Sequence, residues 1–415
     1  MSKLKDCCLN ITDGEHNTVT KDFNTGYFLL ANQNMINGSV LFSCEDRQIS
    51  KSSFDKIYKR CKIENGDILI STVGALGKLA IVKNYRNDYV FQRSVGIIKP
   101  NKSVLDSDFL YYLLLCKESQ KKLFNSSYGS MQKGIKLDTL KKFEFELPSL
   151  EEQRKKTKLL KSLDDKISIN NQINSELESM AKIIYDYWFL QFEFPNEDGK
   201  PYKSSGGKMV WSKELKREIP EGWEVTNLYN ENLFSIIDVG LKKFDKKIYL
   251  ATANIDDGVF TKGNIVDYDS RESRANMQPK QYSVWFAKMK DSVKHLFIPK
   301  NSNWFTDKYI LSTGLYGLQC NEISFAYVAS YIGNKNFEIQ KNLLAHGSTQ
   351  KAISDDDLKK IKLIVPSIDI LKKYAEKINP IFEMIFSNLK ENQELASLRD
   401  FLLPLLMNGQ VVIED

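Results

Sequence analysis

Residues 128–150 read YGSMQKGIKLDTLKKFEFELPSL, and residues 346–368 read HGSTQKAISDDDLKKIKLIVPSI. The two stretches align without a gap at an offset of 218 residues, and 11 of the 23 aligned positions are identical. This offset is much longer than the period of about 20–50 residues that marks a solenoid. The sequence therefore predicts a duplicated domain, and two similar units suggest a target with two-fold character.

Each copy of the repeat shows the same order of parts. Short alternating apolar stretches bounded by Gly, Asn and Asp predict strands, and a helix is expected to follow them at 108–124 or at 324–341. Next come the Gly-Ser-x-Gln-Lys loop, a short capped turn and a strand that ends at Pro148 or Pro366. Proline at this place favours the end of the strand and the start of a helix.

A long helical pattern with apolar residues spaced alternately three and four apart follows each proline, as in a coiled-coil seam. The seam positions in the first copy are Leu160, Leu163, Ile167, Asn170, Asn174, Leu177, Ala181, Ile184 and Trp188. Their equivalents in the second copy are Ile378, Ile381, Ile385, Asn388, Asn392, Leu395, Arg399, Leu402 and Leu406. A polar seam residue costs stability and usually fixes register, although these asparagines could also lie just off the seam and face solvent. The pattern predicts an antiparallel pair of helices, each roughly 60 Å long, with a globular unit at either end.

The composition is that of an ordinary globular protein. The chain has 415 residues, 42% hydrophobic and 27% charged, and a formal net charge of +6, which permits a polyanionic partner without requiring one. Six cysteines include no C-x-x-C pair, and the three histidines are scattered, so no zinc site is predicted and free thiols are expected. The N-terminus lacks the apolar core of a signal peptide, and we expect a cytoplasmic protein without a membrane span.

Taken together, these motifs resemble the specificity (S) subunit of type I restriction–modification systems, the Methylase_S family. The resemblance rests on the loop Gly129–Lys133, the segment Phe145–Gln153 with its following helix, the stretch Gly66–Ser71 and the segment Ile219–Trp223. The second copy departs from the family pattern at Ser367–Ile370, where Glu-Gln is usual. The bodies of the two globular regions also match each other poorly, which the family explains, since its two target-recognition domains read different halves of a split DNA site.

The resemblance implies an α+β fold in which two mixed α/β target-recognition domains are separated by two long helices that form an antiparallel coiled coil, duplicated about a pseudo-two-fold axis. The expected boundaries are target-recognition domain 1 at 1–147, spacer helix 1 at 148–190, a linker at 191–219, target-recognition domain 2 at 220–365, spacer helix 2 at 366–408 and a tail at 409–415. Gly, Pro, Ser and charged residues dominate the linker.

No catalysis is expected in this chain. An adenine methyltransferase needs an Asp/Asn-Pro-Pro-aromatic motif, and the nearest string, Asn379–Phe382, lacks the second proline. The stretch Gly74–Lys78 lacks the remaining residues of a phosphate-binding loop. The family implies no cofactor here, with S-adenosylmethionine, ATP and Mg expected in partner subunits. Implied partners are double-stranded DNA, two methyltransferase (M) subunits and restriction/translocase (R) subunits.

Candidate DNA contacts come from residue types that bind phosphates and base edges. They are Lys78, Arg93, Ser130, Gln132, Lys133, Arg271, Arg274, Ser348, Gln350 and Lys351. The repeated Ser-x-Gln-Lys loops occur in both copies, so a contact there should be to the DNA backbone; alternatively, these loops dock each domain against its helix. The remaining side chains are candidates for base or phosphate contact, or else solvated surface charges.

Other readings remain open. The cluster 183–189 is too apolar for a single seam, which indicates a second packing surface, for methyltransferase subunits by family implication or for the chain's own globular domain. Two alternative functions are a coiled-coil adaptor that bridges proteins through two similar domains, and the reader part of a fused methyltransferase.

Overall fold

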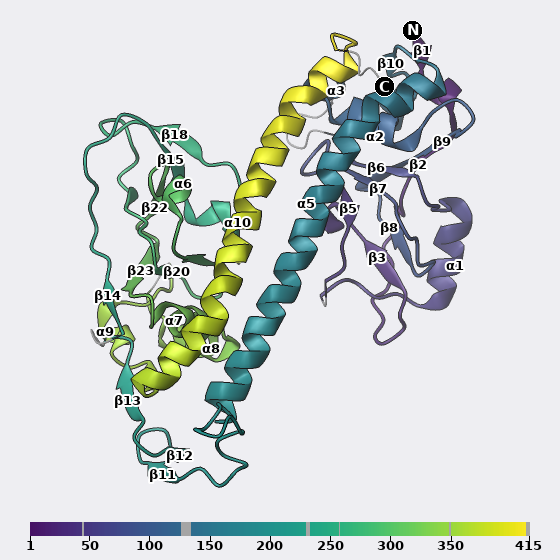
Figure 1. Ribbon diagram of the computed structural model, residues 1–415. Coiled ribbons are helices and arrows are strands. Elements are labelled where there is room, and N and C mark those ends of the chain that lie inside the picture. The colour runs from purple at the N-terminus through teal and green to yellow at the C-terminus, as the bar shows by residue number, and fades with distance from the viewer. Residues whose placement is uncertain (44, 126–133, 230–232, 257, 348–349, 412–415) are drawn as a thin grey trace. The chain divides into compact units, whose positions relative to one another are not determined.

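The computed structural model describes residues 1–43, 45–125, 134–229, 233–256, 258–347 and 350–411. The chain divides into two units. Unit 1 comprises Met1–Ile167 with Glu394–Asp415, and unit 2 comprises Ser168–Gln393. Both units mix helices and strands, as expected (Figure 1). Among the described helices, none is both long and apolar enough to cross a membrane.

The central sheet of unit 1 has four antiparallel strands, with a fully buried strand, β6, in its interior. The strand order is β2 (Cys8–Asp13), β9 (Val95–Pro100), β6 (Ile68–Ser71) and β7 (Leu79–Ile81). Helix α2 (Ser107–Leu115) lies over β6 and β7. Smaller elements are the parallel pair β3 (Phe28–Leu30) and β8 (Tyr89–Phe91), the hairpin β4 (Met35–Ile36) and β5 (Ser39–Val40), helices α1 (Lys51–Arg60) and α4 (Leu137–Lys141), and the pair β1 (Ser2–Lys3) and β10 (Glu144–Phe145).

The central sheet of unit 2 has the same strand order. It runs β14 (Phe234–Ile236), β23 (Leu315–Cys320), β20 (Ser283–Ala287) and β21 (His295–Ile298). Its parallel pair is β15 (Lys247–Leu250) and β22 (Tyr309–Ser312), which β18 (Asn264–Val266) and β19 (Ala275–Met277) extend. Further elements are β13 (Glu224–Asn227) paired with β24 (Lys362–Val365), the hairpin β16 (Ile255–Asp256) and β17 (Val259–Phe260), and helices α6 (Asn303–Thr306) and α9 (Asp355–Leu358).

The two bodies also share a local turn that their poor sequence match concealed. The backbone N–H of Ala31 donates to the side chain of Asn34 at 3.0 Å, and that of Ala251 donates to Asn254 at 3.0 Å. Each turn leads into a short hairpin. Common topology therefore persists where the side chains have diverged.

The helices expected at 108–124 and 324–341 are each broken in two, so the prediction of single helices was wrong. Helix α2 ends before Cys116, whose ψ is 135°, and α3 (Lys117–Asn125) follows. In unit 2, α7 (Phe325–Ile332) is followed by α8 (Lys335–Leu344). The side chain of Asn334 caps α8 by accepting from the N–H of Asn336 at 2.9 Å, which favours a new helix start.

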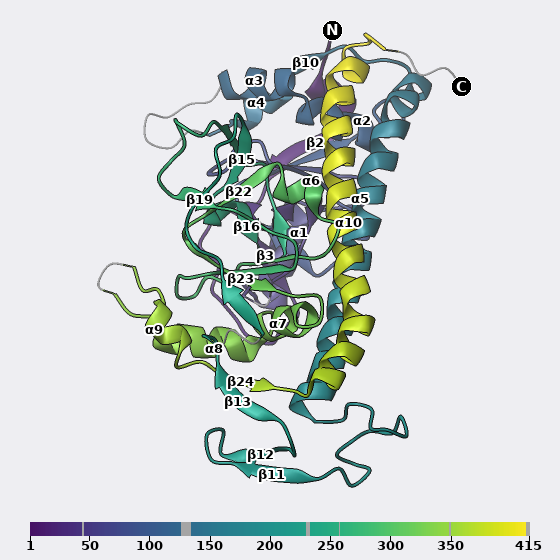
Figure 2. The ribbon, with the colours of Figure 1, turned by 60° about the vertical axis from the view of Figure 1, so that its left-hand side comes forward.

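The long helices are α5 (Leu150–Tyr185) and α10 (Ile368–Met407), which run side by side (Figure 2). In unit 2, Asn170 donates to Asn392 at 2.9 Å, and Asn388 donates to Asn174 at 2.8 Å. Since the partner number falls as the residue number rises, the helices are antiparallel there. Asn170 and Asn174 are buried, so they lie between the helices and do not face solvent.

The segment 191–219, expected to be a linker without elements, contains structure. Strands β11 (Met209–Ser212) and β12 (Arg217–Pro220) form a hairpin. The buried ring of Phe194 stacks on Trp223 and Tyr202, at centroid distances of 4.9 and 4.5 Å. The many Gly, Ser and Lys residues give this segment the composition of a linker. A few aromatic contacts are nevertheless enough to order it.

Candidate nucleic-acid interface

A seven-residue loop follows the central buried strand of each unit, at 72–78 in unit 1 and at 288–294 in unit 2. The same backbone bond closes both loops. The N–H of Ser71 donates to the carbonyl of Lys78 at 2.8 Å, and the N–H of Ala287 donates to Lys294 at 3.0 Å. A lysine therefore occupies the last position of each loop. We refer to these loops as the strand loops.

Each strand loop pairs with the chain just after the repeated Gly-Ser-x-Gln-Lys sequence. In unit 1, Ile135 N–H donates to the carbonyl of Thr72 at 3.0 Å; in unit 2, Ile353 N–H donates to Lys288 at 3.1 Å. Isolated β-bridges join the same regions, Val73 to Gly134 and Met289 to Ala352. Two segments distant in sequence thus meet in the same way in both units.

In unit 1 this arrangement brings two of the predicted contacts to one strand loop. Lys78 and Arg93 are both exposed. The hydroxyl of Thr72 donates to the carbonyl of Arg93 at 3.2 Å, so Arg93 flanks the loop that Lys78 ends. Gly77 has a φ of 75°, and a Cβ there would lie 2.2 Å from Oε1 of Gln120 on α3. The positive φ favours glycine at this position, and a larger side chain would have to displace the ends of Gln120 and Phe124 on α3.

In unit 2 the corresponding region carries Gln350 and Lys351, both exposed. The N–H of Lys290 donates to the carbonyl of Lys351 at 2.8 Å, so these two basic residues lie on neighbouring backbone segments. Arg274 is also exposed, and its carbonyl accepts from the N–H of Thr313 at 2.9 Å.

The sequence reasoning did not select Lys290, although the strand loop reads KMKDSVK. Lys288 differs from Lys290, because its ammonium lies 4.2 Å from the centre of the Tyr316 ring and burial lowers the pKa of Lys288. Both lysines are half-buried, and the aromatic contact that distinguishes Lys288 could be recognised only with the structure.

Arg271 has mainly internal contacts. Its guanidinium donates to the carbonyls of Ala275, at 3.2 Å, and of Tyr268, and it stacks 4.0 Å from the centre of the Tyr268 ring. These bonds hold the turn that carries Arg274. Four of the predicted contact residues, Ser130, Gln132, Lys133 and Ser348, lie outside the described residues.

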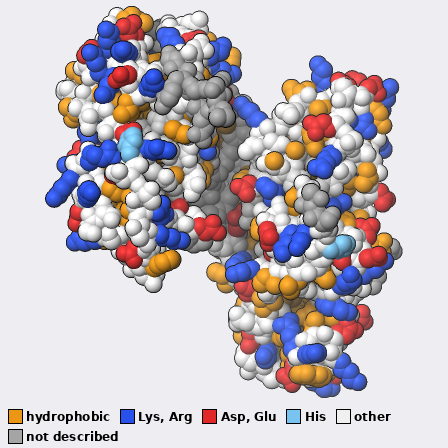
Figure 3. Space-filling view, turned by 180° about the vertical axis from the view of Figure 1, so that it is seen from behind, with side chains coloured by type: hydrophobic (Ala, Val, Ile, Leu, Met, Phe, Trp, Pro, Cys, Tyr) orange, Lys and Arg blue, Asp and Glu red, His pale blue; other side chains and the backbone are white. Residues whose placement is uncertain are grey.

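Charge alone does not mark out an interface. On the face drawn in Figure 3, lysine and arginine side chains are spread among acidic and apolar ones. This distribution agrees with the modest net charge of +6. The strand loops stand out instead by their common backbone contacts in two units of dissimilar sequence.

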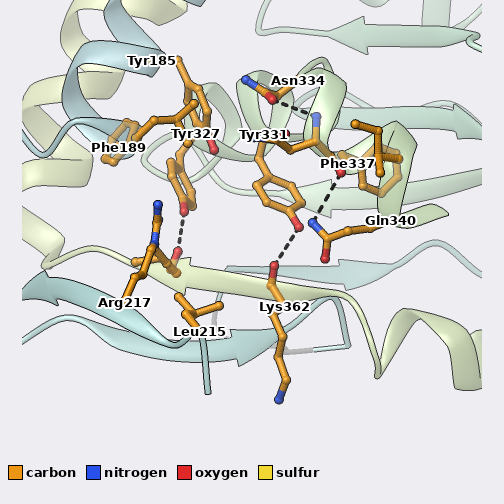
Figure 4. A pocket seen from close by; sticks show the side chains of 14 residues that line it. Tyr185, Phe189, Leu215, Arg217, Tyr327, Tyr331, Asn334, Phe337, Gln340 and Lys362 are labelled. Atoms are coloured by element: carbon orange, nitrogen blue, oxygen red, sulfur yellow. Dashed lines mark hydrogen bonds between the residues drawn. The ribbon is translucent and has the colours of Figure 1, made fainter. Parts of the chain in front are cut away.

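The pocket in Figure 4 is lined by Tyr, Phe, Leu, Ile, Asn, Gln, Lys and Arg side chains of unit 2. The hydroxyls of Tyr327 and Tyr331 donate to the carbonyls of Ile364 and Lys362, so they anchor β24. The string Asn379–Phe382 lies inside α10, and Phe382 is buried in the core. Across the described ranges, no group of three or more His, Cys, Asp or Glu residues is placed to hold a metal ion.

A second surface runs along α5 in unit 2. Exposed apolar side chains recur three, four or seven residues apart, which places them on one helix face. We call these side chains the α5 stripe. They are Ile169, Ile173, Met180 and Ile183 on α5 and Tyr187 in the short π-helix Asp186–Leu190 that continues it, and they are 40–67% exposed. The apolar cluster 183–189 is thus divided, because Tyr185, Trp188 and Phe189 are buried in the core of unit 2.

Comparison with known proteins gives a consistent family. The family description "Type I restriction modification DNA specificity domain" matches residues 20–179. Over 375 residues, the chain is 27% identical to the type I restriction enzyme MjaIX specificity subunit of Methanocaldococcus jannaschii, covering 87% of this chain and 82% of that protein. It is 24% identical over 407 residues to the HindI specificity subunit of Haemophilus influenzae, covering 84% of this chain and 87% of that one. The fold is shared with the crystal structure of the type I restriction–modification S subunit from M. genitalium, with a TM-score of 0.54, 16% identity, and coverage of 98% of this chain and 95% of the other.

Proposed function

We propose, from the premise that this chain belongs to the specificity-subunit family of type I restriction–modification systems, that it binds a bipartite DNA site, one half through each unit. Specificity subunits are the DNA-recognition subunits of these systems and are not catalytic. The observation that best supports the proposal is the pair of strand loops, which have the same length and backbone contacts but different side chains. Common scaffolds with divergent side chains suit two domains that read different sequences.

The DNA contacts in this proposal follow from exposure. Lys78 and Arg93 would contact one half-site, and Arg274, Gln350 and Lys351 the other. Arg271 would position Arg274 through the turn it stabilises. Ser130, Gln132, Lys133 and Ser348 remain predictions for backbone contact. In this scheme target-recognition domains 1–147 and 220–365 are joined by spacer helices 148–190 and 366–408, with 191–219 between the copies.

The helix pair would set the distance between half-sites. We propose that α5 and α10 form an antiparallel coiled coil related by a pseudo-two-fold axis, with half-sites about one turn of DNA apart. The asparagine pairs across the helices support this assignment, because shifting either helix would leave the buried amides of Asn170 and Asn174 without these partners.

The α5 stripe is the surface we propose for the methyltransferase subunits. A row of exposed apolar side chains on a helix commonly marks a protein–protein contact. Two methyltransferase subunits would supply S-adenosylmethionine binding, and restriction/translocase subunits would supply ATP- and Mg-dependent chemistry. This chain would bind none of these cofactors itself.

Exchanging residues 1–147 for the corresponding domain of a relative with a different target should change only one half of the methylated motif. The reason is that each unit has its own sheet and its own strand loop. Base-resolution mapping of adenine methylation in host DNA measures this directly. A change in both halves, or in neither, would contradict the assignment of one half-site to each unit.

Introducing lysine at Ile173 and Met180 together should weaken binding of the methyltransferase subunit at least tenfold. Burying a large apolar side chain contributes about 1.5–3 kcal/mol, and about 1.4 kcal/mol corresponds to a factor of ten. Ser168→Lys, an exposed position on the same helix outside the α5 stripe, is the matched control. Binding can be measured by titrating the purified methyltransferase, and equal affinity for all variants would exclude the stripe.

The adaptor alternative makes a different prediction about DNA. If the two units bridge proteins, the chain should show no salt-dependent affinity for duplex DNA. If it contacts phosphates, log affinity should fall linearly with log salt concentration, with a slope of about −0.9 per phosphate contact. A binding series at several salt concentrations separates the two functions.

A further inference from the structure

Unit 2 contains a cluster of charged and ionisable side chains in its interior. Lys341 on α8 has no exposed surface, and its Nζ lies 2.7 and 2.9 Å from the two carboxylate oxygens of Glu338. Nε2 of His295 lies 3.0 Å from Oε1 of Glu338, and both residues are buried. Burial works to raise the pKa of Glu338, but the bonds from His295 and Lys341 lower it overall. Burying such groups carries a large desolvation cost, so the cluster contributes little net stability compared with apolar packing.

The cluster acts on the strand loop of unit 2. The ammonium of Lys341 donates to the carbonyl of Ser292 at 2.9 Å. The neighbouring residue, Asn342, accepts from the N–H of Asp291 at 2.9 Å. Helix α8 therefore ties two consecutive residues of the loop that carries Lys290, and Lys290 in turn bonds the backbone of Lys351.

Unit 1 ties its strand loop from the same repeat position, but with neutral residues. Gln120 and Leu123 stand 218 residues before Glu338 and Lys341. The amide of Gln120 donates to the carbonyl of Gly77 at 3.3 Å. In both units a helix packed against the loop therefore holds it in place. Among the described residues, the side-chain bond in unit 1 comes from the neutral Gln120, and that in unit 2 comes from the buried, charged Lys341.

We infer that Glu338, Lys341 and His295 form a positioning cluster, which holds the strand loop of unit 2 so that Lys290 and Lys351 meet the DNA backbone of one half-site. This inference rests on the proposed function, because it requires that the loop faces DNA. A loop held in its bound geometry loses less conformational freedom on binding, so its lysines contribute more to affinity. Lys290 and Lys351 are the contacting residues, and the cluster acts through them.

The test transfers the neutral pair of unit 1 into unit 2. The full-length Glu338→Gln/Lys341→Leu variant keeps an uncharged, well-filled interior, and its thermal unfolding midpoint should stay close to that of the parent chain. Its affinity for duplex DNA that carries the split target motif should fall about tenfold, because the released loop must be ordered when DNA binds. The salt slope should become shallower by about one to two phosphate contacts.

The surface pair Lys300 and Glu322, 3.3 Å apart in the same unit, supplies the control. Its Lys300→Leu/Glu322→Gln variant makes the same change of charge away from the strand loop and should bind DNA like the parent. If the Glu338→Gln/Lys341→Leu variant unfolds, Asn342→Ala provides the test instead. It removes the second hydrogen bond from α8 to the loop, that from the N–H of Asp291 to Asn342. A folded variant with unchanged affinity and salt slope would overturn the positioning role.

The outcomes also separate this inference from the proposed function. Lys290→Ala/Lys351→Ala should lower affinity and salt slope to a similar extent as the graft. If this variant binds normally while the parent shows salt-dependent binding, the strand loop of unit 2 does not face DNA. The inference then fails together with the assignment of Lys351 as a DNA contact, while the binding of a bipartite DNA site by the chain still stands. If the parent chain shows no salt-dependent binding, the proposed function fails as well.

Discussion

Replacing Phe189 with alanine is expected to destabilise unit 2 by about 3–5 kcal/mol, the usual cost of removing a large buried ring. Phe189 is 2% exposed. Its ring centre lies 4.7 Å from Tyr327, 4.8 Å from Tyr374 and 5.9 Å from Trp223. Tyr327 lies on α7, Tyr374 on α10 and Trp223 directly before β13, so the substitution would open a cavity where several elements meet. The measurement is the free energy of unfolding from urea titration of the full chain, followed by tryptophan fluorescence.

Tyr187, two residues before Phe189, has its side chain on the surface. Tyr187 is 40% exposed, and Tyr187→Ala should change the free energy of unfolding by no more than about 0.5 kcal/mol. The same variant should weaken methyltransferase binding if the α5 stripe is the docking surface. Normal stability of Phe189→Ala with loss of partner binding would reverse the assignment and place Phe189 at the interface.

The alternating three-and-four spacing predicted both long helices. This spacing arises when apolar residues occupy one face of a helix, and it is visible in a short stretch of sequence. The asparagines at matched positions, Asn170 with Asn388 and Asn174 with Asn392, were visible for the same reason. Their hydrogen bonds, which join Asn170 to Asn392 and Asn388 to Asn174, were not. The breaks at Cys116 and near Asn334 depend on the local backbone and a capping bond, which leave the apolar pattern intact. Composition misled at 191–219, where a few aromatic contacts decide the structure.

The candidate interface could be predicted only in part. Charge and repetition selected Lys78, Arg93, Arg274 and Lys351, which are all exposed. The positions of Arg93 and Lys351 beside the strand loops depend on hydrogen bonds between distant segments, Thr72 to Arg93 and Lys290 to Lys351, which no local pattern encodes. Lys290 could have been selected from its place in a lysine-rich loop between two strands. The buried Lys341 could not, since a lysine on a predicted helix is normally solvated.

Asp164→Ala is expected to destabilise unit 1 by about 2–3 kcal/mol, because it removes the carboxylate that joins three helices. Oδ1 of Asp164 accepts from Arg399 of α10 at 2.8 Å, and Oδ2 accepts from the hydroxyl of Tyr112 of α2 at 2.7 Å. The side chains of Asp164 and Arg399 are 27% and 24% exposed, so the loss should be smaller than for a fully buried pair. Arg399 also bonds Asp400 at 2.8 Å, which leaves it with one carboxylate in the variant.

The double variant Asp164→Leu/Arg399→Leu should recover most of that loss. Arg399 occupies a seam position of α10, near the buried Leu403 and Leu406, where an apolar side chain can pack without the cost of burying charge. The remaining deficit should be about 1 kcal/mol, for the Tyr112 hydroxyl that loses its acceptor. Urea unfolding of Asp164→Leu, Arg399→Leu and the double variant gives the interaction energy between the two residues. Additive losses would show that Asp164 and Arg399 act independently, and that the charge at this seam position is tolerated without its partner.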